Sequence, residues 1–227
     1  MGTYVSAYDR LLKMPAVFSI NTIVRSSGMS RDTVKVLLSR WAANKLVESA
    51  GPRAGIYFNR IVDPKGEQAN AVKALVMKYP SATLCGASVL HSTGWSTQIP
   101  STLHVAIESR PSYAQIMGVT LFPKPLNWFR FMQDHSAWER DRGKGDPANE
   151  VTTYGLRALK PHWALADLYA DRSRRAWHPD EDDLDIPDEE MAGVEKACKA
   201  LGGAPNWLNA PDEDPVPTPV SRKNQPR

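Results

Sequence analysis

SINTIVRSSGMSRDTVKVLLSRWAANKLVES, residues 19–49, holds two short helical patterns separated by one glycine. Ser19 can cap the first helix, which we expect to run to about Val24, and Ser30 can cap the second. A serine in this position accepts a hydrogen bond from a backbone N–H of the first turn. Gly28 lies between the helices and supplies the backbone freedom that a tight turn needs. The stretch therefore predicts a helix-turn-helix.

The second predicted helix separates apolar from polar side chains. Its apolar residues recur at helical spacing and form one stripe toward a core: Val34, Leu37, Leu38 and Trp41. At about 100° per residue, the opposite face carries polar residues and one valine. That face holds Asp32, Lys35, Val36 and Ser39, with Arg31 and Arg40 at its borders.

Further elements complete a small domain around this pair. YVSAYDRLLKMP, residues 4–15, has helical spacing and ends at a proline. KLVES, residues 45–49, and GIYFN, residues 55–59, are expected to be short strands joined by the loop AGPRA, residues 50–54. Three helices and a two-stranded wing make a winged helix-turn-helix.

The chemistry of this domain points to duplex DNA. A helix fits the major groove, where Arg31 and Lys35 could bond guanine or phosphate and Val36 could touch a thymine methyl group. Ser30 and the helix N-terminus suit a phosphate, and Arg53 at the wing tip could enter the minor groove or meet the backbone. The predicted DNA-binding residues are Ser30, Arg31, Asp32, Lys35, Val36, Ser39, Arg40 and Arg53.

The charge distribution favours the same partner. The chain of 227 residues has a net charge of only +3, but residues 1–60 hold nine Lys and Arg against three Asp and Glu. Residues 61–227 hold nineteen against twenty-two. A basic front on a mildly acidic body is typical of a polyanion site. Two alternatives stay open: the cations could only solvate a surface helix, and a winged helix could bind a protein instead of DNA.

Composition limits the compartment and the class. Hydrophobic residues make up 42% of the chain, enough for a packed core. Cys85 and Cys198 lie far apart without CxxC spacing, which disfavours a disulfide framework or a cysteine-rich zinc site. No signal-like segment and no apolar run near the ~18 residues of a membrane span is present. We therefore expect a cytoplasmic protein without membrane contact.

The remainder predicts a mixed α/β domain over residues 63–203, so that the overall class is α+β, with the winged helix-turn-helix in residues 1–62. Helices are expected in residues 67–80, 87–94, 156–177 and 188–201, and strands in residues 82–86, 101–109 and 118–133. Pro161 is expected in the first turn of a helix. Residues 204–227 form a Pro-rich tail that should be loosely ordered, although Trp207 and Leu208 could pin its start.

The order of these patterns resembles the AbiEi-type antitoxins, the transcriptional regulators of bacterial type IV toxin–antitoxin systems. The similarity covers about residues 5–200. Its specific part is residues 80–108 within YPSATLCGASVLHSTGWSTQIPSTLHVAIES, residues 79–109, and the ALADL helix at residues 164–168 adds to it. The resemblance implies autorepression of an operon by the N-terminal domain. It also implies that the α/β domain counters a nucleotidyltransferase toxin, a partner for which direct contact is not required. The acidic, Pro-rich end does not map onto the family.

An enzyme is not expected, nor is a cofactor. The five histidines are scattered without HExxH or other ligand spacing. The acidic run HPDEDDLDIPDEE, residues 178–190, could bind a divalent cation but lacks the EF-hand glycine and terminal glutamate. More often such a run is a solvated loop leading into a helix.

Three function classes follow. The leading one is a DNA-binding antitoxin and autorepressor, which could oligomerise on its operator. The second is a winged-helix regulator whose C-terminal domain senses a small molecule. The third is a protein-interaction adaptor that uses the winged helix without DNA.

Overall fold

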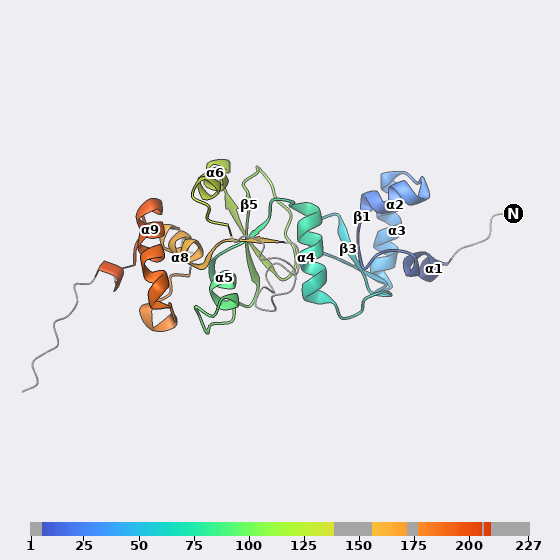
Figure 1. The fold of residues 1–227 in the computed structure, drawn as a ribbon. Coiled ribbons are helices and arrows are strands. Elements are labelled where there is room, and N and C mark those ends of the chain that lie inside the picture. Colours follow the sequence, from blue (N-terminus) through green and yellow to red (C-terminus); the bar gives the residue numbers. More distant parts are fainter. Residues whose placement is uncertain (1–5, 139–155, 172–176, 206, 210–227) are drawn as a thin grey trace, which may run out of the picture.

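A computed structural model describes residues 6–138, 156–171, 177–205 and 207–209. The described chain is a mixed α+β structure with two sheets, and it is elongated (Figure 1). Its N-terminal elements are α1 (Ala7–Leu12), β1 (Val17–Ser19), α2 (Ile20–Ser27), α3 (Arg31–Ala43), β2 (Val47–Ser49) and β3 (Ile56–Asn59). The expected helices and both expected strands of this part are therefore present.

The N-terminal sheet has three strands, not the two expected from the sequence. Its order is β1-β3-β2, with both pairings antiparallel. The additional strand, β1, pairs Val17 with Phe58 and Ser19 with Ile56. Three residues are too few to show an alternating pattern, so this strand is defined by its partner β3 and not by its own sequence.

Helices α1–α3 cover one face of the N-terminal sheet. Side chains of neighbouring antiparallel strands that lie directly opposite share a face, and on this face the rings of Phe18 and Tyr57 stack with centroids 6.0 Å apart. The buried residues of this first core are Leu11, Phe18, Ile20, Ile23, Val34, Leu38, Trp41 and Val47. Asn59 fixes α1 to the sheet, because its buried amide Nδ2 donates to the carbonyl of Leu11 at 2.8 Å.

Helix α4 (Glu67–Lys78) covers the other face of the same sheet. Val17, Ile56 and Phe58 point to this side and belong to a second, larger core that continues through α4 into the rest of the chain. Figure 1 shows α4 standing between the N-terminal sheet and the strands that follow. The two parts of the chain thus share one buried apolar cluster.

The C-terminal sheet has the strand order β6-β5-β4-β7. Its strands are β4 (Thr83–Leu84), β5 (Leu103–Glu108), β6 (Val119–Lys124) and β7 (Arg157–Ala158). Strands β5 and β6 are parallel, β4 is antiparallel to β5, and β7 is parallel to β4. Pro123 is tolerated inside β6 because this strand lies at the edge of the sheet.

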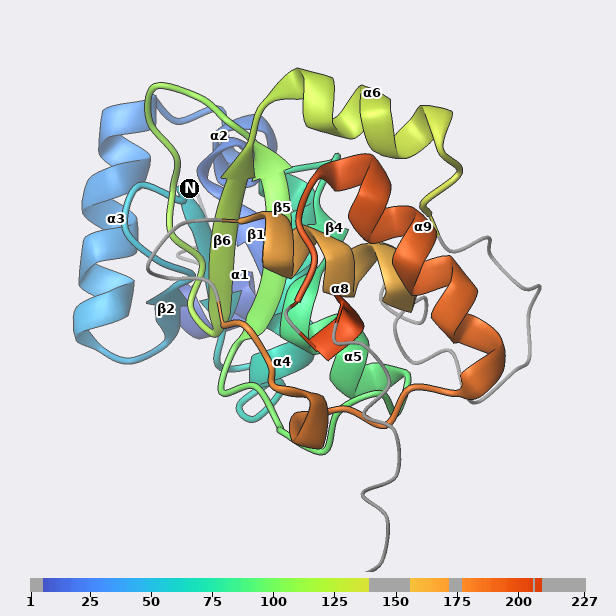
Figure 2. The ribbon, with the colours of Figure 1, turned by 90° about the vertical axis from the view of Figure 1, so that its left-hand side faces the viewer.

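Helices surround this sheet (Figure 2). They are α5 (Gly86–Ser92), α6 (Leu126–Asp134), α8 (Pro161–Ala170) and α9 (Met191–Leu201), with short 3-10 turns at η1 (Glu181–Asp183), η2 (Asp188–Glu190) and η3 (Trp207–Asn209). Figure 2 shows α8 and α9 in front of the strands, and α8 packs against both α9 and α5. Pro161 occupies the first turn of α8, as expected.

Two sequence-based expectations for this part were wrong. Residues 126–134 form helix α6 and not a strand, because Trp128 and Met132 bury one side of a helix at spacing i, i+4. The start of the helix expected over residues 156–177 is instead strand β7, which pairs with β4. The helix itself begins only at Pro161.

Trp207 and Leu208 hold the start of the predicted tail against the rest of the chain, as the sequence allowed. Trp207 Nε1 donates to the hydroxyl of Tyr169 at 3.3 Å, and Leu208 packs against the large core. Residue 206 and residues 210–227 of the predicted tail lie outside the described residues. Among the helices that the structure describes, none is long and apolar enough to cross a membrane.

Candidate nucleic-acid interface

The α2–α3 pair is built by local capping. Ser19 accepts a hydrogen bond from the N–H of Thr22 at 3.2 Å, and the Thr22 hydroxyl accepts one from the N–H of Ser19, so that α2 begins with a reciprocal cap. Gly28 ends α2 with a positive φ of 69°, a conformation that costs glycine little. Ser30 then caps α3 by accepting from the N–H of Thr33 at 3.2 Å. The predicted turn and both caps are confirmed.

Burial decides which side of α3 is available to a partner. Val34, Leu38 and Trp41 are buried in the first core, and Leu37 is half-buried beside them. The remaining predicted residues of this helix are exposed: Arg31, Asp32, Lys35, Val36, Ser39 and Arg40. We call these six residues the exposed face of α3.

Val36 is the apolar member of this exposed face. Val36 is 53% exposed, whereas Val34, Leu38 and Trp41 of the opposite stripe are buried. A single exposed valine is common on protein surfaces and needs no function. Beside charged residues on a helix that could enter a groove, it can also contact a thymine methyl group.

Two cations of the exposed face have partners within the chain. The Nη1 of Arg31 donates to Oδ1 of Asn21 at 3.2 Å, which links the start of α3 to the first turn of α2. The Nζ of Lys35 lies 2.9 Å from Oδ1 of Asp32. This hydrogen bond and the lysine charge lower the pKa of Asp32, so the pair is ionic at neutral pH. Lys35 is therefore partly neutralised by its neighbour.

The side chains of Arg40 and Arg53 are exposed and make no hydrogen bond or ion pair with any residue in the described part of the chain. Arg53 lies in the β2–β3 loop, residues 50–55, and has a positive φ of 59°. A guanidinium that has no partner to lose can bind a phosphate without breaking an existing contact. These two residues are the cations most readily offered to an anion.

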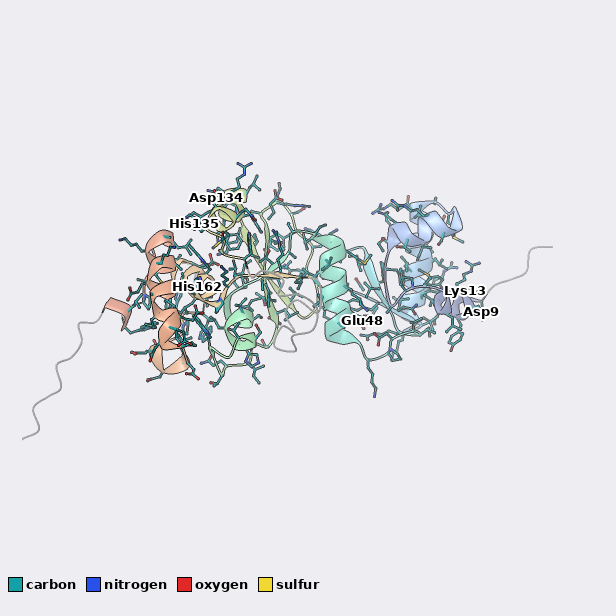
Figure 3. The ribbon with its side chains drawn as sticks, viewed as in Figure 1. Asp9, Lys13, Glu48, Asp134, His135 and His162 are labelled. Atoms are coloured by element: carbon teal, nitrogen blue, oxygen red, sulfur yellow. The ribbon has the colours of Figure 1, made fainter. Side chains whose placement is uncertain are left out.

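Acidic residues near the exposed face are few. Figure 3 shows Asp9 beside Lys13 on α1, and Glu48 toward α4, whereas the α2–α3 turn lies on the opposite side of this part of the molecule. Glu48 is also paired with Arg60, whose Nε lies 2.8 Å from the carboxylate. Asp32 is thus the one carboxylate on α3 itself.

The structure brings seven of the eight predicted residues together on one helix and its cap, and places Arg53 on a separate loop. Sequence reasoning missed Asn21, the partner of Arg31. Its position in the first turn of the preceding helix was the only signal, and spacing along the chain does not reveal a contact between two helices.

Ionisable groups in the C-terminal part are arranged differently. The Nζ of Lys124 lies 3.0 Å from Oδ2 of Asp167, and Trp128 Nε1 donates to Oδ1 of Asp167 at 2.7 Å. Burial by itself lowers the pKa of Lys124, but the carboxylates of Asp167 and Asp171 outweigh it and raise that pKa. Burial raises the pKa of Cys85, so its thiol stays protonated and unreactive. This buried cluster is internally satisfied and holds α8 on the sheet.

The acidic run of residues 178–190 makes hydrogen bonds both within itself and to a distant part of the chain. Asp183 accepts a hydrogen bond from Gln98 Nε2 at 2.6 Å and another from the N–H of Asp180 at 3.2 Å. The run forms the turns η1 and η2 that lead into α9. In the part of the chain that the structure describes, no group of three or more His, Cys, Asp or Glu is placed to hold a metal ion.

No protein-family model matches this chain, and no curated protein matches it with significant similarity. The resemblance to AbiEi-type antitoxins therefore stays a prediction from the sequence.

Proposed function

We propose that residues 1–62 are a winged helix-turn-helix that binds duplex DNA, with α3 as the recognition helix and the β2–β3 hairpin as the wing. The element order α-β-α-α-β-β and the tight turn at Gly28 support this proposal. The observation that carries it is the exposed face of α3, which is cationic and follows directly from that turn. A solvated helix would need neither the turn nor the hairpin beside it.

In this proposal α3 lies in the major groove. Arg31 is held by Asn21 at the start of the helix, which is the end that reaches base edges. Val36 provides the apolar contact, and Arg40 in the last turn meets the phosphate backbone. Arg53 contacts the neighbouring backbone or minor groove from the wing.

We further propose that the whole chain is an antitoxin of the AbiEi type and a repressor of its own operon. The support is the resemblance of residues 80–108, which include β4, α5 and β5, and of residues 164–168 in the buried helix α8. The functional partner is a nucleotidyltransferase toxin encoded beside it. The chain acts in this proposal as a binding protein and not as an enzyme.

The test uses the full chain and its own upstream DNA. Fluorescence anisotropy at several salt concentrations should give tighter binding to this DNA than to a scrambled duplex. The double variant Arg31→Ala, Arg40→Ala removes two cations that would lie close to DNA phosphates. The slope of log K against log salt should therefore flatten by about 2. Lys196→Ala, Lys199→Ala on α9 removes the same charge at the other end of the molecule (Figure 1) and serves as the matched control.

Equal binding by both double variants would contradict the assignment of α3. The antitoxin proposal is tested separately, by co-expressing the intact chain with the neighbouring toxin gene and scoring growth. DNA binding without growth rescue would favour the small-molecule regulator instead.

A further inference from the structure

The β2–β3 loop is attached to the C-terminal part of the molecule. Ala50 and Ala54, at its two ends, are buried in the large core. The N–H of Met117 donates to the carbonyl of Ala50 at 2.7 Å, and Lys78 Nζ donates to the carbonyl of Ala54 at 3.2 Å. Met117 belongs to residues 109–118, the β5–β6 connection, and Lys78 ends α4. The loop is therefore held at both ends by elements outside the N-terminal sheet.

Gly51 permits this close approach. A Cβ atom at this position would lie 2.2 Å from the carbonyl oxygen of Gln115, far inside the contact limit, and the neighbouring atoms are backbone. Its φ of 151° is also rarely adopted by residues with a side chain. Only glycine lets the β2–β3 loop lie directly on the β5–β6 connection.

Tyr79 fixes the β5–β6 connection in turn. Its hydroxyl accepts a hydrogen bond from the N–H of Ala114 at 2.6 Å and donates one to the carbonyl of Ala114 at 2.9 Å. Tyr79 and Ala114 are both buried, and Ile116 beside them belongs to the same core. A chain of contacts thus runs from α4 through the β5–β6 connection to the β2–β3 loop.

Arg53 is the exposed cation of this loop. Gly51, two residues before it, and Ala54, directly after it, are held by the contacts above. The side chain of Arg53 itself is exposed and has no partner among the described residues. Its positive φ, unusual for a residue with a side chain, is kept only if the surrounding loop is held. A loop ordered before binding spends less conformational entropy when it meets DNA.

We infer that the C-terminal part supports the wing, so that Tyr79 and Gly51 are positioning residues for the contact between Arg53 and the phosphate backbone of duplex DNA. This inference rests on the proposed DNA binding by the winged helix. It assigns to α4 and the β5–β6 connection a part in DNA affinity, although neither belongs to the helix-turn-helix.

The test compares full-length variants on one duplex that carries the upstream DNA. Arg53→Ala removes one phosphate contact and should weaken binding about eightfold at about 0.1 M salt. Tyr79→Phe leaves the backbone groups of Ala114 unsatisfied and should weaken binding by about threefold or more. Gly51→Ala forces the loop off the β5–β6 connection and should approach the effect of Arg53→Ala.

A merely structural role is separated from positioning by combining the changes. If Tyr79 acts through Arg53, then Tyr79→Phe in the Arg53→Ala background should change the affinity by less than about twofold. Tyr169→Phe is the matched control, because its hydroxyl also donates to a backbone carbonyl, that of Pro179, but at the other end of the molecule. In footprinting, Tyr79→Phe should no longer protect the DNA contacted by the wing, beside the site of α3, but should still protect the DNA contacted by α3.

Each result decides the inference. Thermal melting identifies any variant that fails to fold. Gly51→Ala and Tyr79→Phe disturb the contact between the β2–β3 loop and the β5–β6 connection from its two sides. The test therefore needs only one of these two variants to fold. The inference is overturned if a folded Gly51→Ala or Tyr79→Phe variant binds DNA as tightly as the wild-type chain. It is also overturned if Tyr79→Phe weakens binding as much in the Arg53→Ala background as it does in the wild-type chain. Failure of the wild-type chain to bind any duplex contradicts the proposed function itself, which is a different outcome.

Discussion

The carboxylate of Asp32 offers a quantitative test of the proposed binding of α3 to DNA. It lies on the exposed face of α3 and pairs with Lys35 at 2.9 Å, with the two side chains 90% and 55% exposed, respectively. Exposed pairs of this kind contribute little to stability because water screens them. Near a phosphate, however, the carboxylate would repel the DNA. It would also hold Lys35 in an ion pair, so that this lysine could not contact a phosphate. Asp32→Asn should therefore tighten DNA binding.

The size of the effect follows from counterion release. Each phosphate neutralised by a cation steepens the plot of log K against log salt by about 0.9. Releasing Lys35 from Asp32 adds one effective cation, so the slope should steepen by about 0.9. If Asp32→Asn and the wild-type chain bind equally near 1 M salt, the variant should bind about eightfold more tightly at about 0.1 M salt. The gain should shrink steadily as salt is added.

The assay is fluorescence anisotropy of the full chain on its upstream DNA, over about 0.05 to 0.3 M salt. Asp182→Asn is the control, since it makes the same charge change in η1, at the end of the molecule opposite α3 (Figure 1). An unchanged slope in Asp32→Asn would refute the placement of this residue near phosphate. If Asp32→Asn instead weakens binding, and does so only for duplexes that keep one particular C·G base pair, the carboxylate accepts a hydrogen bond from the amino group of that cytosine.

Three other predictions concern stability. Asn59→Ala removes the buried amide that donates to Leu11, and urea unfolding should show a loss of about 1–3 kcal/mol. Lys124→Met leaves the buried Asp167 carboxylate without its lysine, and chemical denaturation should show a loss of about 3–5 kcal/mol. Burial lowers the pKa of His104 below the usual 6.5, so the unfolded chain binds a proton that the folded chain excludes. Melting temperature should thus fall as the pH drops from about 7.5 to about 5.5, and the fall should be smaller in His104→Asn.

Local signals in the sequence were sufficient for the α2–α3 pair. Ser19, Gly28 and Ser30 each act within three or four residues of their own position, through caps or a turn. The burial of Val34 and Leu38 also follows from their spacing in one helix. Predictions of this kind need no knowledge of the rest of the fold.

Strand β1 and helix α6 show where such signals end. Val17 pairs with Phe58, a residue 41 positions later, and nothing in the three residues of β1 announces that partner. In α6, the aromatic residues favoured a strand, but burial of Trp128 and Met132 on one side of a helix outweighed that preference. Tertiary packing decided both elements.

The candidate site divides in the same way. The pair of Asp32 and Lys35 has the i, i+3 spacing of neighbours on a helix and could have been read from the sequence. The link of Arg31 to Asn21 crosses between helices, and the contact of Gly51 with Gln115 joins residues 64 positions apart. Both depend on how distant elements meet.

Helix α4 has a consequence for the evolution of this molecule. Because it covers the N-terminal sheet and also belongs to the core of the C-terminal sheet, neither half can be exchanged for a foreign one by recombination at residues 60–66 alone. A chimera joined there would set an unrelated helix against Val17 and Phe58, and a poor fit would leave a cavity or exposed apolar surface. Successful exchange would have to carry α4 and the side chains of the sheet face together, so the two halves are expected to diversify as a matched pair.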